Sequence, residues 1–126
     1  MKKLLALVIP SVLAVSLVAG CAGEVRTYVD EEKTISPSVN QEFIIALDSN
    51  PTTGYNWEVS YDESTLILVG DKYSPDEKAK GLVGAGGTQY FQFKALKTGK
   101  TEITLTYKRS WETDFAEQKV FKVDIK

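Results

Sequence analysis

The stretch Glu102-Ile-Thr-Leu-Thr-Tyr107 carries the pattern that decides the fold of this chain. Its apolar residues Ile103, Leu105 and Tyr107 alternate with a glutamate and two threonines. Successive side chains of a β-strand point to opposite faces of the sheet, so an apolar period of two is typical of a strand with one buried face. The stretch therefore predicts a strand that packs on a core and turns a polar face to solvent.

The same period of two recurs along most of the chain, and turn-forming residues separate the alternating stretches. Further clear strands are predicted at Glu42–Leu47, Phe91–Ala95 and Phe121–Ile125, and weaker ones at Glu24–Val29, Trp57–Tyr61 and Thr65–Val69. Turns are predicted at Asn50–Gly54, Ser74–Asp76, Gly81–Gly87 and Lys97–Lys100. Seven short strands in about 100 residues predict an all-β, immunoglobulin-like β-sandwich, preceded by a signal segment.

The amino terminus has the organisation of an export signal. Lys2 and Lys3 precede the apolar run Leu4–Val18, which is short for a membrane-spanning helix. Leu17-Val-Ala-Gly-Cys21 resembles the lipobox of bacterial lipoproteins, in which the cysteine is acylated and becomes the first mature residue. The alternative is an ordinary signal peptide followed by a free thiol, but an unpaired cysteine is a liability in an oxidising compartment.

This lipobox predicts how the chain is divided and where it resides. We expect a lipoprotein signal peptide at residues 1–20, a lipid-anchored amino terminus with a tether and the start of the first strand at 21–30, and one sandwich domain at 31–126. Cys21 would carry acyl chains such as palmitate. The protein would then be an exported monomer, anchored to a membrane of the cell envelope at the outer membrane or the cell surface.

The composition excludes several classes of function. Without Lys2 and Lys3, 13 basic side chains stand against 17 acidic ones, so a nucleic-acid partner is not expected. The chain has no histidine, which excludes Ser-His and Cys-His nucleophilic catalysis and the usual zinc sites. A carboxylate pair for glycoside hydrolysis is disfavoured because the acidic residues are scattered over alternating positions. We therefore expect a protein that is not an enzyme and needs no cofactor.

Three loops have unusual compositions: the first loop (Ser49–Trp57), the glycine loop (Lys78–Gly87) and the third loop (Lys108–Glu117). They join predicted strands two and three, four and five, and six and seven. Loops separated by an even number of strands emerge at the same end of a sandwich. We therefore expect the three loops to be neighbours in space.

Each loop taken alone allows more than one interpretation. In the first loop, the aromatic residues either begin the next strand or enter an apolar cleft. The glycine loop lacks the Gly-Lys-Ser/Thr and the following helix of a phosphate-binding loop, so it is a connector or a backbone surface that presses against another protein. In the third loop, Arg109 and Trp111 are residue types enriched at binding hot spots, but Trp111 could also fold back over the end of the sandwich.

Taken together, the loops resemble in order and spacing the signatures of the chagasin-like inhibitors of cysteine proteases. The motifs are Asn50-Pro-Thr-Thr-Gly-Tyr55 followed by Trp57, Gly84-Ala-Gly-Gly87, and Arg109-x-Trp111. The resemblance runs through nearly all of the mature domain. It implies a chagasin-like domain that inhibits papain-like cysteine proteases reversibly and non-covalently, by inserting the three loops into their V-shaped active-site cleft.

The resemblance also implies a role for each loop. Thr52 and its neighbours would sit over the catalytic cysteine and histidine of the enzyme, while Leu82 and Val83 would lie toward the non-primed subsites. Arg109 and Trp111 would cover the primed side. Trp57 is expected in the core, whereas Tyr55 is left open between core and interface. The residues predicted to bind the protease are Asn50, Pro51, Thr52, Thr53, Gly54, Tyr55, Leu82, Val83, Gly84, Gly86, Gly87, Arg109 and Trp111.

The sequence departs from the family pattern at two places in the loops. Ser110 stands where the family usually carries a proline, and Ala79-Lys80-Gly81 lengthens the glycine loop. A loop that is not already in its bound shape loses more entropy on docking, so Ser110 is expected to weaken binding.

The main alternative function is an envelope-anchored adhesin or carbohydrate-binding module that uses the same loops. The other is a purely structural lipoprotein. Sugar stacking needs Trp111 to offer an open flat face, whereas a wedge needs a projecting ridge.

Overall fold

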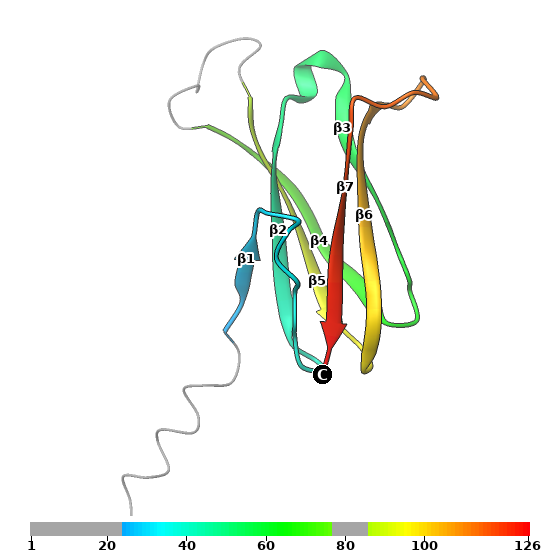
Figure 1. Ribbon diagram of the computed structural model, residues 1–126. Coiled ribbons are helices and arrows are strands. Elements are labelled where there is room, and N and C mark those ends of the chain that lie inside the picture. Colours follow the sequence, from blue (N-terminus) through cyan, green and yellow to red (C-terminus); the bar gives the residue numbers. More distant parts are fainter. Residues whose placement is uncertain (1–23, 77–85) are drawn as a thin grey trace, which may run out of the picture.

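The computed structural model describes residues 24–76 and 86–126, and it confirms the predicted all-β sandwich of seven strands. Two sheets pack face to face, as Figure 1 shows. Among the described residues there is one short 3₁₀ helix, η2, and no helix long and apolar enough to cross a membrane. The elements are β1 (Arg26–Tyr28), β2 (Glu42–Ser49), η2 (Pro51–Thr53), β3 (Tyr55–Tyr61), β4 (Leu66–Pro75), β5 (Gly87–Ala95), β6 (Gly99–Arg109) and β7 (Glu117–Ile125).

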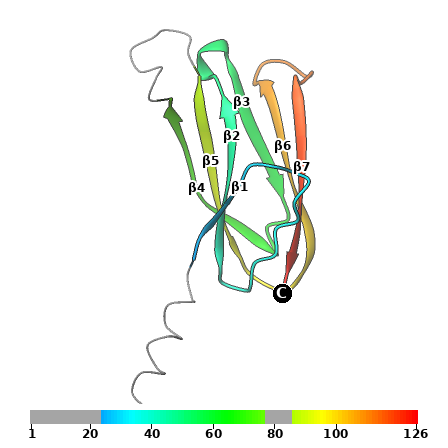
Figure 2. The same cartoon turned by 60° about the vertical axis from the view of Figure 1, so that its left-hand side comes forward.

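The strand order places the two layers and their edges. Four strands form one sheet in the order β1-β2-β5-β4, and three form the other in the order β3-β6-β7, which Figure 2 shows from the side. All the pairs are antiparallel except β1 with β2. Because β2 leads through η2 into β3, the first loop carries the chain from one sheet to the other.

The core lies between the sheets and uses the alternating residues that the sequence predicts. Ile103 and Leu105 of β6 are fully buried, while Glu102 on the same strand is exposed. Four phenylalanines at equivalent inward positions complete this layer, and each fully buried phenylalanine or leucine contributes about 1.5–3 kcal/mol. The largest fully buried side chains are Phe43, Phe91, Phe93, Phe121, Ile35, Ile45, Leu66, Ile103, Leu105 and Val123.

Several predicted boundaries are wrong, and the end of β4 has the largest error. The turn predicted at Ser74–Asp76 does not begin there, because β4 continues through Pro75, which pairs with Gly87. A proline is tolerated at this position because β4 is an edge strand, whose outer backbone groups need no partner. β3 begins at Tyr55, two residues before the predicted start, and β1 is shorter than Glu24–Val29 at both ends.

The amino-terminal strand fixes where the chain joins the sandwich. Arg26 pairs with Phe43 and Tyr28 with Ile45, so β1 runs parallel to β2 and starts at the end of β2 that is remote from the first loop. The chain then crosses to the other sheet, where Ile35 bridges Val123 of β7. Residues 1–23, including the predicted signal peptide and Cys21, lie outside the described residues, as do residues 77–85 of the glycine loop.

Candidate functional site

The described parts of the three unusual loops meet at one end of the sandwich, as predicted. Figure 1 shows the turn between β2 and β3 and the loop between β6 and β7 at the same end of the molecule. The Nε of Arg109 lies 3.2 Å from the carbonyl oxygen of Thr53, and a Cβ atom placed on Gly86 would lie 3.2 Å from the carbonyl oxygen of Ser49. Leu82, Val83 and Gly84 lie outside the described residues.

The backbone of the first loop forms a closed turn that its sequence favours. Pro51 stands at the first position of η2, where its fixed φ suits a helical start and its missing N–H costs nothing. Gly54 ends the turn with φ +89°, in the left-handed region that glycine enters without strain. The N–H groups of Thr53 and Gly54 donate to the carbonyls of Asn50 and Pro51 at 3.2 and 3.0 Å. The tip is therefore shaped by its own backbone.

The hydroxyl groups at the tip are also bonded within the loop. Thr52 Oγ1 donates to Oδ1 of Asn50 at 2.6 Å, and Thr53 Oγ1 donates to the carbonyl of Asn50 at 2.7 Å. The N–H of Asn50 donates to the hydroxyl oxygen of Tyr107 at 2.9 Å, which ties the loop to β6. Thr52 and Thr53 are nevertheless exposed, so both residues remain accessible to a partner.

A row of aromatic side chains connects the tip to the core. Trp57 is buried, as predicted, and its Nε1 donates to the carbonyl of Asp48 at 2.8 Å. Tyr107 lies against Trp57 with ring centroids 4.9 Å apart, and Tyr55 stacks on Tyr107 at 5.2 Å. The guanidinium carbon of Arg109 lies 4.5 Å from the centre of the Tyr55 ring. Tyr55 is thus half-buried, in a row of aromatic rings that connects the first loop to the core.

Trp111 projects from the third loop and touches the first. Ser110 and Trp111 occupy the middle of a turn closed by the N–H of Glu112 and the carbonyl of Arg109 at 3.1 Å. The indole is 70% exposed, so it does not fold back into the core. One edge of its six-membered ring meets Gly54, where an added Cβ would lie only 2.6 Å from Cη2 of Trp111. The side chain forms a ridge beside the tip of the first loop.

The root of the glycine loop lies within the sheet. Gly87 is buried, pairs with Ser49 on one side and Pro75 on the other, and has no space for a Cβ because it would clash with the carbonyl of Ser74. The glycine is therefore required by close strand packing at this position. Gly86 is half-buried, and its carbonyl accepts from the N–H of Asp76.

One candidate residue was missed by the sequence reasoning. Phe115 lies in the third loop, and 52% of its surface is exposed, which makes it the second large aromatic side chain that this loop presents. The signal was present in the sequence, because Phe115 is a lone phenylalanine between acidic residues of a loop.

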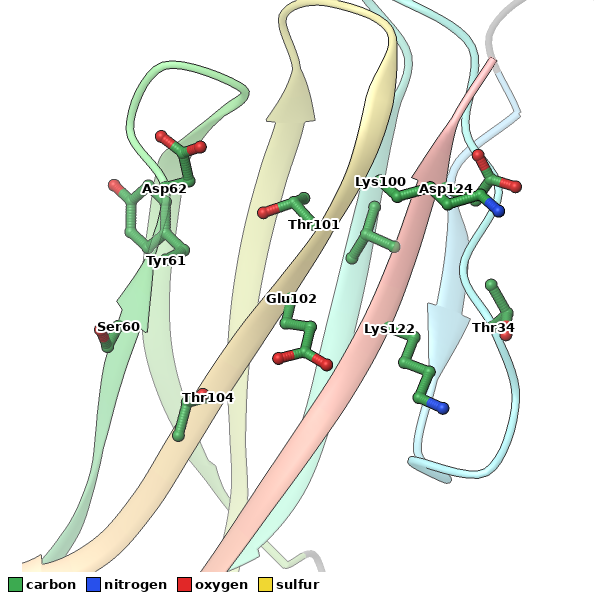
Figure 3. Close-up of a pocket in the computed structure, with 11 residues that line it drawn as sticks. Thr34, Ser60, Tyr61, Asp62, Lys100, Thr101, Glu102, Thr104, Lys122 and Asp124 are labelled. Atoms are coloured by element: carbon green, nitrogen blue, oxygen red, sulfur yellow. The ribbon is translucent and has the colours of Figure 1, made fainter.

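A surface hollow lies elsewhere in the described part of the chain. Figure 3 shows this hollow on the outer face of β3, β6 and β7. Its volume is about 790 Å³. Ser60, Glu102, Thr104 and Lys122 point into it from the three strands, and Asp62 stands above it in the turn after β3, remote from the first loop. It has no aromatic platform apart from Tyr61. Within residues 24–76 and 86–126, no group of three or more His, Cys, Asp or Glu residues could hold a metal ion.

Comparisons with known proteins identify the family of this chain. Residues 36–125 match the chagasin family peptidase inhibitor I42. Amoebiasin-2 of Entamoeba histolytica is 35% identical over 88 residues, which cover 70% of this chain and 72% of the relative. Chagasin of Trypanosoma cruzi is 33% identical over 99 residues, which cover 74% and 87%.

Solved structures show the same relationship. The crystal structure of a cysteine protease inhibitor from Entamoeba histolytica superposes with a TM-score of 0.70 at 30% identity, covering 81% of this chain and 96% of that one. The solution structure of amebosin gives a TM-score of 0.68 at 28% identity, covering 82% and 100%. The match to the family and the identity to its members lead to one conclusion: this chain belongs to the chagasin family of peptidase inhibitors.

Proposed function

We propose that this protein is a reversible, non-covalent inhibitor of papain-like cysteine proteases, and that the loop end of the sandwich is the surface that enters the active-site cleft. The observation that carries the proposal is the exposed, internally bonded tip at Thr52 and Thr53 beside the projecting Trp111. The family to which the chain belongs consists of peptidase inhibitors, and the related crystal structure from Entamoeba histolytica is of a cysteine protease inhibitor.

The geometry of the tip explains how it would block the enzyme without being cut. A protease cleaves a peptide when a scissile carbonyl comes within about 3–3.5 Å of the nucleophile in the correct orientation. In the first loop, the carbonyls of Asn50 and Pro51 accept hydrogen bonds from within the same turn. A protease would have to break these bonds before it could bind the segment as an extended substrate. The closed turn therefore fills the cleft as a poor substrate.

The flanking contacts follow from the same placement. With Thr52 over the catalytic residues, Arg109 and Trp111 would cover the primed side, and Leu82 and Val83 would offer aliphatic side chains to the non-primed subsites. A standard interface buries about 800 Å² on each partner, which three loops at one end of a small domain can supply. Exposed aromatic residues that become desolvated at an interface often dominate its binding energy, and Trp111 is the side chain in this chain that best fits that role.

The decisive experiment is a titration of residues 22–126 against papain, with trypsin as the control. We expect reversible inhibition of papain and none of trypsin. Papain whose catalytic cysteine is replaced by alanine should bind almost as tightly, because no covalent bond is involved. Mass spectrometry after prolonged incubation should find the segment from Asn50 to Trp57 intact. Rapid cleavage there, or an acyl-enzyme adduct, would contradict the proposed mechanism.

We also propose that Cys21 is acylated and anchors the domain to a membrane of the cell envelope. The support is the lipobox Leu17–Cys21 together with the preceding apolar run and its two lysines. Replacement of Cys21 by serine should abolish metabolic labelling with palmitate and move the protein from the detergent phase to the aqueous phase, or leave it unprocessed. Absence of palmitate labelling in the wild type, or labelling that persists in the Cys21→Ser protein, would contradict a lipid anchor at Cys21.

A further inference from the structure

Arg109 makes three contacts that join two loops far apart in the sequence. Its Nε donates to the carbonyl of Thr53 at 3.2 Å, its guanidinium lies over the ring of Tyr55 at 4.5 Å, and its Nη1 lies 3.8 Å from Oε1 of Glu112. The first two contacts reach the first loop and the third stays within the third loop. The arginine is half-buried, so its charge is partly removed from water.

The geometry points to Arg109 as a positioning residue, which locks the first loop and the third loop into one rigid unit before any protease is bound. The inference rests on the proposed function and deepens it, because it assigns to Arg109 a role in the free inhibitor besides any contact with the enzyme. Gly54 contributes to the same rigid unit, because the absence of a side chain there leaves the space in which the Trp111 ring packs against the first loop. We call this contact the seat of Trp111.

The chemistry of the contacts requires an arginine. A guanidinium can lie over an aromatic ring while its in-plane N–H groups donate to neighbouring acceptors. A lysine ammonium lacks this planar fork and cannot reproduce the two contacts with the same geometry. The pair with Glu112 is exposed and contributes little by itself, so the contacts with Thr53 and Tyr55 carry the lock.

The contacts of Arg109 would also compensate for the loop rigidity that a proline at position 110 would supply. A proline at the second position of a turn fixes φ and reduces the freedom of the loop, and this chain lacks it at Ser110. When only a fraction of the free molecules has the binding-competent shape, the apparent Kd rises by the inverse of that fraction. Arg109 would hold the third loop in place across the gap between loops, and so keep that fraction high.

The first test separates positioning from direct contact. We would measure Kd and association rate with papain for Arg109→Met and Arg109→Lys, each with and without Ser110→Pro. We expect Arg109→Met to weaken binding about tenfold, with Arg109→Lys recovering only part of the loss. Ser110→Pro should then improve binding about fivefold in the Arg109→Met protein but only about twofold in the wild type, since rigidity is already supplied there. Equal gains in both backgrounds would overturn the inference, because a purely direct contact does not depend on loop rigidity.

The second readout uses the free protein. The chain has two tryptophans, of which Trp57 is buried and Trp111 is exposed, so 5-fluorotryptophan labelling gives two distinguishable fluorine signals. In Arg109→Met we expect the Trp111 signal to move toward that of a free indole, while the Trp57 signal stays in place. An unchanged Trp111 signal would contradict the lock. If the wild type fails to inhibit papain, the proposed function fails, but this readout still decides on the lock.

A third test examines the seat of Trp111 at Gly54. Gly54→Ala should weaken papain binding at least tenfold in the wild type, but no more than about threefold when Trp111 is already alanine. Gly99→Ala is the matched control, because Gly99 also has positive φ, at +144°, yet has no neighbour within 4 Å and lies at the opposite end. It should leave Kd unchanged. Equal losses from Gly54→Ala in both Trp111 backgrounds would show that the seat has no role.

Discussion

The loop end and the hollow on the outer face of β3, β6 and β7 are opposite in character. The hollow is a concavity of about 790 Å³, and threonine, serine, lysine and acidic side chains line it. At the loop end, Trp111 projects with 70% exposure beside a turn that is closed by its own backbone hydrogen bonds. An enzyme or a receptor for small molecules works with its hollows. A protein that fills the cleft of another protein works with a ridge, so here the concavity is the wrong place to look for function.

Replacement of Trp111 by alanine tests the comparison most severely. Truncation of a desolvated aromatic anchor should weaken papain binding by about 2 kcal/mol or more, which is about thirtyfold. The melting temperature should change little, because the indole is mostly exposed. Inhibition assays and thermal denaturation of the same preparations measure both effects. Retained affinity with a collapse in stability would make Trp111 a structural residue.

Thr52→Ala should have a smaller effect at the centre of the same surface. The substitution removes a methyl group and the hydroxyl that donates to Asn50, but the backbone hydrogen bonds of η2 remain. We expect a loss of about 0.5–1.5 kcal/mol in papain binding. A measured loss larger than that of Trp111→Ala would move the energetic centre of the interface from the ridge to the tip.

Asp62, above the hollow, should affect stability and leave binding unchanged. The hydroxyl and N–H of Ser64 donate to its Oδ1 at 2.7 and 2.9 Å, and the hydrogen bond from the side chain is the largest cause of a lowered pKa. A lowered pKa means that the carboxylate stabilises the fold at pH values above the ordinary aspartate pKa of about 4, and that this stabilisation is lost as the pH falls through the pKa of the folded state.

The lowered pKa of Asp62 determines how the stability of an Asp62 variant should depend on pH. The melting temperature of Asp62→Ala should be slightly below that of the wild type between pH 5 and 8, and the difference should shrink below about pH 4. The Kd for papain should be equal for the two proteins at pH 6. A difference in melting temperature that grows toward low pH would contradict the assigned hydrogen bonds.

Substitutions inside the hollow should have the smallest effect of all. Glu102→Gln and Lys122→Ala alter exposed residues that lie opposite each other in the register of β6 and β7, so we expect no measurable change in papain inhibition. Surface substitutions of this kind usually change stability by less than about 0.5 kcal/mol. Impaired inhibition by either variant would show that the hollow, and not the loop end alone, takes part in binding the protease.

The sequence predicted those features of the fold and site that depend on local residues. Strand alternation at Phe43 and Ile103 reports burial directly, and Pro51 with Gly54 specifies a turn in any context. Features that depend on strand order and register were missed. Pro75 reads as a turn until β4 is known to be an edge strand. The contact of Arg109 with Tyr55 arises from the register of β3 on β6, which no local pattern encodes.

The parallel pairing of β1 with β2 has a mechanical consequence. Arg26 lies level with Phe43, and the first loop begins at Ser49, about 20 Å further along β2 at about 3.4 Å per residue. Any attachment of the chain upstream of Arg26 therefore holds the sandwich from the end that is remote from the first loop. A protease that pulls on the loops against such an attachment would load β1 and β2 along their length. The hydrogen bonds between the two strands would then share the force and resist it together, whereas a sideways pull would open them one at a time.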